Sequence, residues 1–133
     1  MNARALGTYR RQSVETTDAA GVLLLLLDGL QRFCDEAQQA FAANCVPRAL
    51  EQTARARAIV DELLVSLDRT QAPELCDNLS GIYSFASRRL VEALTQRSGS
   101  AVAEAWRALA PVVEGFRKAV PRARAEGLRA ARR

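Results

Sequence analysis

The chain has 133 residues, of which 49% are hydrophobic and 26% are charged, and its formal net charge at pH 7 is +4. This length supports one domain with its own core, and the balance is an ordinary globular one. Histidine is absent, which excludes histidine-based triads, histidine general bases and mixed cysteine–histidine zinc sites. Alanine, leucine, arginine and glutamate dominate and β-hairpin signals are missing, so the composition predicts an all-α fold.

The first half of the chain begins with residues 1–17, which show no sustained apolar period and are expected to form an extended N-terminal arm. Asp18 is expected to cap a helix over residues 19–43. That helix opens with "GVLLLLLDGL", whose five leucines exceed the single stripe that a bundle helix buries. The apolar run is too short for a membrane span, which takes about 20 residues, and acidic residues before it argue against a signal peptide. Either two neighbours flank this helix, or a partner helix covers its second stripe.

Three further helices follow at short intervals. Asn44 can end the first helix, and Pro47 and Pro73 suit the first turns of helices over residues 47–67 and 73–97. A fourth helix is expected from about Ala101 to Pro121, with a kink at Pro111. Short loops predict an antiparallel up-down four-helix bundle over residues 18–121. The expected core stripes of the last three helices are Ala49, Thr53, Ala56, Val60, Leu63, Leu67; Leu75, Leu79, Ile82, Ala86, Leu90, Ala93; and Val102, Ala105, Trp106, Leu109, Val112, Val113, Phe116, Val120.

The C-terminal end of the chain is basic. Seven basic side chains and one acidic side chain lie between Arg117 and Arg133. Residues 122–133 lack a core stripe, so we expect a disordered tail. A basic tail is a feature of nucleic-acid-binding regulators, which remain an alternative, but this one lacks aromatic residues for base stacking and an apolar face for membranes.

No motif for catalysis, cofactors or metals is present. The three cysteines, Cys34, Cys45 and Cys76, are an odd number without CxxC spacing, which favours reduced thiols in the cytoplasm. The chain contains no GxxxxGK[ST] or GxGxxG sequence and no ExxH pair for a di-iron bundle. We therefore expect no enzymatic activity, no cofactor and no metal.

Three collinear blocks resemble a known family. They are "YRRQSVETTDAAGVLLLLLDG", then "VSLD" at residues 65–68, and "LCDNLSGIYSFASRRLVEA" in the third helix. In this order and spacing they are similar to the flagellar secretion chaperone family, FliS, over about residues 6–120. Leu27 stands where that family has a tyrosine, and Ala19 where it has a proline.

The resemblance implies a small cytoplasmic helical bundle that binds the C-terminal segment of flagellin, prevents its premature polymerisation and delivers it to the flagellar type III export apparatus. It also implies that the arm, through Tyr9, helps to engage the export gate. We assign Leu26 to the core and Leu27 to the edge of a partner groove. A chaperone paralogue for another exported protein, and a structural bundle that self-associates, remain alternatives. The expected partner-binding residues are Tyr9, Leu23, Leu27, Leu67, Asn78, Ile82, Tyr83, Phe85 and Arg89.

Overall fold

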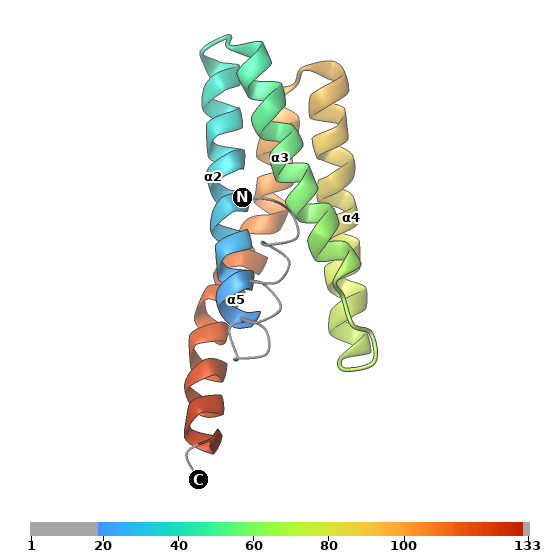
Figure 1. Cartoon of the computed structure of the whole chain (residues 1–133). Coiled ribbons are helices and arrows are strands. Elements are labelled where there is room, and N and C mark those ends of the chain that lie inside the picture. The colour runs from blue at the N-terminus through green and yellow to red at the C-terminus, as the bar shows by residue number, and fades with distance from the viewer. Residues whose placement is uncertain (1–18, 132–133) are drawn as a thin grey trace, which may run out of the picture.

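A computed structural model describes the backbone of residues 19–131 and the side chains of residues 19–120. It contains four helices, α2 (Ala19–Ala42), α3 (Val46–Val65), α4 (Pro73–Gln96) and α5 (Gly99–Ala131), and no strand within those residues (Figure 1). The predicted all-α four-helix bundle is confirmed. The expected arm and the Asp18 cap lie outside the described residues.

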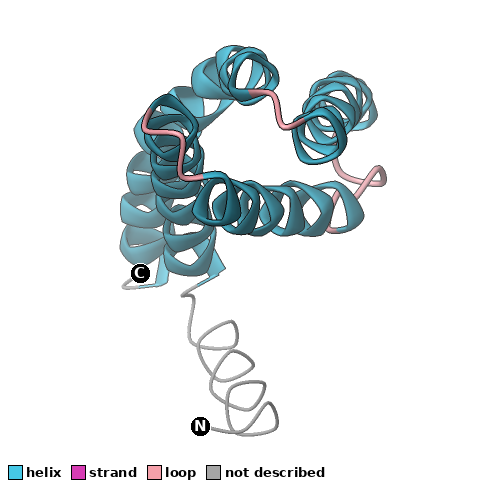
Figure 2. Ribbon diagram, turned by 90° about the horizontal axis from the view of Figure 1, so that it is seen from above, coloured by secondary structure: helices cyan, strands magenta, loops and turns pink. Residues whose placement is uncertain are grey.

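The helices close into a ring. Each packs against the next along the chain, and α5 returns to pack against α2. Viewed from above, the four helices surround a common centre (Figure 2). Successive helices run in opposite directions, so α2 and α4 begin at the end of the bundle where the second half of α5 lies (Figure 1).

The helix boundaries follow the predicted local signals closely. Asn44 adopts a left-handed backbone with φ of 60°, which asparagine tolerates well, and the chain turns there into α3. Pro47 and Pro73 occupy the first turns of α3 and α4. The backbone of α5 is one helix through Pro111 to Ala131, and it includes most of residues 122–133, for which we expected a disordered tail. The structure does not describe the side chains after residue 120, so the role of the basic tail stays a prediction.

The core is built from one face of each helix. In α3 every expected stripe residue within the helix is buried, and in α4 and α5 most are. Large side chains fill the centre and alanines allow the helices to approach. The largest fully buried side chains are Leu27, Leu30, Leu90, Leu109, Val60, Val102, Val113, Thr53 and Cys34.

The leucine run faces two neighbours. Leu27 is 0% exposed, so its assignment to a groove edge was wrong, whereas Leu26 is partly buried and packs against the core. The buried row passes through Leu27, Leu30 and Cys34, and five consecutive leucines contain no contrast that reveals this phase. Because α3 and α5 flank α2, most of the run is accounted for within the bundle, and Leu25 alone is left 73% exposed.

The Asp28–Gly29 pair joins α2 to both of these neighbours. The Arg117 Nη2 atom lies 2.9 Å from Asp28 Oδ1 and so links α5 to α2. On the α3 side, a Cβ added to Gly29 would lie 3.3 Å from the Cδ1 atom of Ile59, so the missing side chain permits a close helix approach.

Candidate functional site: an apolar groove between α4 and α5

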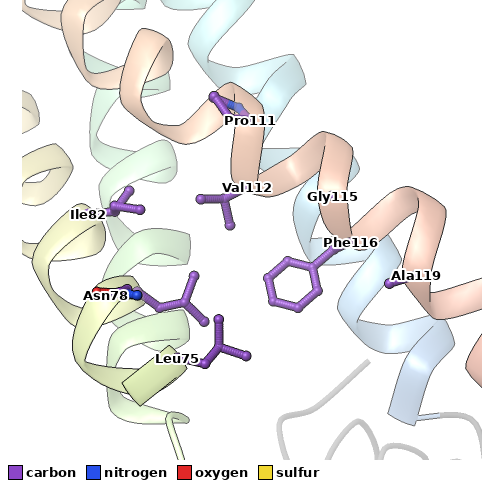
Figure 3. A pocket seen from close by; sticks show the side chains of 9 residues that line it. Leu75, Asn78, Ile82, Pro111, Val112, Gly115, Phe116 and Ala119 are labelled. Carbon is purple, nitrogen blue, oxygen red and sulfur yellow. The ribbon is translucent and has the colours of Figure 1, made fainter. Parts of the chain in front are cut away.

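The described surface is hollowed between the first half of α4 and the middle of α5. This groove has a volume of about 370 Å³. Figure 3 shows Leu75 and Ile82 extending from α4 toward Val112 and Phe116 of α5. Among the lining residues only Asn78 has a polar side chain; the full set is Leu75, Asn78, Leu79, Ile82, Pro111, Val112, Gly115, Phe116 and Ala119.

Two rows of apolar residues on α4 create one wall of this groove. One row, which includes Leu79 and Tyr83, is buried in the core. The second row, with Leu75 and Ile82, is turned toward α5 and is incompletely covered, and Leu75 is 53% exposed. An apolar side chain left so exposed inside a concave surface is typical of a binding groove.

The α5 wall of the groove projects less than the α4 wall because several of its side chains are small. Val112 and Phe116 are partly buried against the core, while Pro111, Gly115 and Ala119 are exposed along the outer edge (Figure 3). The groove therefore exists because side chains between α4 and α5 do not fill the space between these helices.

Farther along α4, an ion-pair network connects the same two helices. Arg89 Nη2 lies 2.7 Å from Glu104 Oε2 of α5, and Arg89 also pairs with Glu92 on its own helix. Its Nε atom is buried and has no hydrogen-bond acceptor among the described residues. We interpret Arg89 as a residue that fixes the spacing of α4 and α5 beyond the groove.

The structure separates the predicted partner-binding residues. Asn78 and Ile82 line the groove, and Phe85 is 39% exposed on α4. Tyr83 is only 2% exposed, and its burial raises the pKa of its hydroxyl, so it is a core residue like Leu27. The two remaining described positions, Leu23 and Leu67, are partly buried against the core, and Tyr9 lies outside the described residues.

Sequence reasoning missed much of the groove. Leu75, Val112 and Phe116 were expected in the core because they continue the helical stripes, and a stripe carries no information about where two helices part. A weaker signal was present on α5, where Pro111, Gly115 and Ala119 follow one another at four-residue spacing and so share one face.

The described residues contain no cluster of three or more histidine, cysteine, aspartate or glutamate side chains that could hold a metal ion. Within the same part of the chain, no helix is long and apolar enough to cross a membrane.

The cysteines are expected to differ sharply in reactivity. Burial, and secondarily the charge of Asp35, raises the pKa of the Cys34 thiol from 9.0 to about 12, whereas Cys45 is exposed. Iodoacetamide at about pH 8 should therefore modify Cys45 in the folded chain and Cys34 only after unfolding, as mass spectrometry would detect. The Cys34 thiol ionises at a lower pH in the unfolded chain than in the folded chain. The free energy of unfolding should therefore fall as the pH rises from 9 to 12. Rapid modification of Cys34 in the native chain would contradict its burial.

Comparison with known proteins identifies the family. The family model described as flagellar protein FliS matches residues 1–123. The chain belongs to the FliS family. A curated relative, the flagellar secretion chaperone FliS of Bacillus subtilis (strain 168), is 30% identical over 96 residues, which cover 72% of this chain and 71% of the relative. The FliS resemblance found in the three sequence blocks is thus confirmed, and the third block contains the α4 wall of the groove.

Proposed function

We propose that this FliS-family chain is a flagellar export chaperone that acts in the cytoplasm. It binds the C-terminal segment of flagellin, prevents premature polymerisation and delivers this cargo to the flagellar type III export apparatus, where the arm with Tyr9 contacts the export gate. The proposed function involves no catalysis and no cofactor. It is supported by membership of the family and by the name of the Bacillus subtilis relative.

The observation that carries the proposal is the apolar groove between α4 and α5. An amphipathic helix binds by placing its apolar side chains into a hydrophobic groove, usually through residues three or four positions apart. Leu75, Ile82 and Phe116 offer such a helix a continuous apolar surface, and Asn78 offers one hydrogen-bonding side chain at the rim.

Cargo that is unfolded before binding must be ordered on the chaperone. Such coupled folding costs about 2–5 kcal/mol or more of the gross interaction energy, so the complex is weaker than its contact area alone would imply. This cost suits a chaperone, which has to release its cargo at the export apparatus.

Isothermal titration calorimetry with a synthetic peptide of the organism's own flagellin C-terminal segment tests the proposal. We expect saturable one-to-one binding with a negative heat-capacity change, since apolar surface is buried. Raising the salt concentration from 50 to 200 mM should change the affinity by less than about threefold, whereas phosphate-mediated binding of nucleic acid would weaken by about 10³-fold or more.

A scrambled peptide of the same composition is the control and should not bind. Absence of binding by the native peptide would contradict the proposed cargo. Steeply salt-dependent binding of an oligonucleotide, with no binding of the peptide, would instead favour the alternative of a nucleic-acid-binding regulator.

A further inference from the structure

Two helical glycines lack a packing reason within the described residues. A Cβ added to Gly29 or Gly99 would touch a neighbouring side chain, at 3.3 Å from Ile59 Cδ1 and 2.9 Å from Phe41 Cβ respectively. At Gly81 and Gly115 the same Cβ would have no atom within 4 Å. Glycine is the poorest helix former after proline, so each of these two residues weakens its helix without a compensating contact in the described part of the chain.

The two glycines differ in their relation to the groove. Gly115 is one of the groove-lining residues of α5, whereas Gly81 is exposed on α4 and is not part of the lining. The space next to Gly115 is therefore open, and Gly115 itself belongs to the groove lining (Figure 3).

The two sides of the groove differ in the size of the side chains that line them. On α4, Leu75 and Ile82 project large side chains, and Phe116 lies between the two helices (Figure 3). On α5, Gly115 is preceded and followed at four-residue spacing by Pro111 and Ala119. The exposed edge of that helix therefore has no large side chain at these three positions. A helix placed in this groove would meet the large side chains of Leu75, Ile82 and Phe116 at its floor, and small side chains and exposed backbone along the outer edge of α5.

We propose that Gly115 is a specificity-determining residue of the groove, and that the bound cargo helix contacts the backbone of α5 there. The inference rests on the proposed function, in which the groove holds the C-terminal segment of flagellin. The occupant is an amphipathic helix that places a small residue against Gly115 and large apolar residues between Leu75, Ile82 and Phe116.

The physical reason is the distance between helix axes. Packed helices lie 8–10 Å apart depending on the side chains at their contact, so a side chain at position 115 would move the cargo helix away from α5. The large cargo side chains would then be withdrawn from the hollow beside Phe116 and would lose their close contacts, which fall off steeply with distance.

Four variants of the full chain test this inference, namely Gly115→Ala, Gly115→Leu and the matched controls Gly81→Ala and Gly81→Leu. Because both glycines face open space, each alanine variant should raise the melting temperature of the free chain, by about 2–4 °C. Binding of the flagellin peptide should weaken about tenfold in Gly115→Ala and more than about a hundredfold in Gly115→Leu. Both Gly81 variants should bind as the unchanged chain does.

The outcomes separate this inference from the proposed function. If the Gly115 variants bind normally while Leu75→Asp abolishes binding, the groove holds the cargo but Gly115 does not select it, and the inference is overturned. If the Gly81 variants lose as much affinity as the Gly115 variants, the effect is not specific to the groove and the inference is equally overturned. A Gly115→Ala variant that melts below the unchanged chain would overturn it too, because the space beside the glycine would then be filled in the free protein. If every variant, Leu75→Asp included, keeps its full affinity, the groove is not the cargo site.

Discussion

Replacing Leu27 with alanine should lower the free energy of unfolding by about 3–5 kcal/mol, near the upper end of what such substitutions cost. The side chain is 0% exposed and belongs to the central cluster with Leu30 and Cys34. Its removal would lose the transfer free energy of the buried atoms and would leave a cavity between helices that are held on both sides of α2. An equilibrium urea titration followed by circular dichroism measures this change. An unchanged m-value would show that the unfolded state is unaffected.

The matched control is Leu25→Ala, two residues earlier in the same leucine run. Leu25 is 73% exposed, so this variant should change stability by no more than about 0.5 kcal/mol. Equal effects of the two substitutions would mean that the leucine run does not have the phase described here, and that Leu27 is not a core residue.

The second large effect concerns the groove. Leu75→Asp should leave the free chain folded but weaken binding of the flagellin peptide by more than about a hundredfold, because a carboxylate would be buried without a partner in the complex. In the free chain Leu75 is 53% exposed and lies in the first turn of α4, where a negative charge is favourable to the helix. Circular dichroism melts and calorimetry on the same samples would separate folding from binding.

Leu25→Asp is the control for this substitution. It places the same charge on another exposed leucine, on α2 and outside the groove lining. We expect it to retain full affinity for the peptide. If both variants lose binding, the cargo uses an apolar surface that extends to α2; if neither does, the groove is not the cargo site.

The positions of the helices could be predicted from sequence because their ends carry strong local signals. Proline fixes the backbone dihedral of a first helical turn, and asparagine is one of the few residues that accept a left-handed conformation. Pro47, Pro73 and Asn44 therefore marked boundaries that the structure reproduces within one or two residues. The regular stripe of α3 was equally informative, since polar and apolar residues alternate along it with a clear helical period.

The phase of α2 and the groove could not be obtained in the same way. A run of identical leucines has no polar residue to mark the outer face. Leu26 was therefore assigned to the core from its spacing to Leu30 and Phe33, and Leu27 to the groove edge by analogy with a tyrosine in the family. The groove depends on the separation of α4 and α5, which is a property of two helices together. Asn78 and Ile82 were found because they lie in the family-like block of α4, whereas the contribution of α5 requires the tertiary structure.

The closure of the ring by α5 has a consequence for synthesis on the ribosome. The ion pair between Asp28 and Arg117 joins residues 89 positions apart, so α2 gains its second neighbour only when the last helix has been made. Ribosomes add about 5–20 residues per second, so these 89 positions take roughly 4–18 s to synthesise. Until then the leucine-rich surface of α2 lacks its second neighbour. During this interval the nascent chain exposes apolar surface that the finished protein buries, and it is then most prone to aggregate. Slower translation of the segment that encodes α5 should therefore lower the yield of soluble protein, even though the folded bundle itself is unchanged.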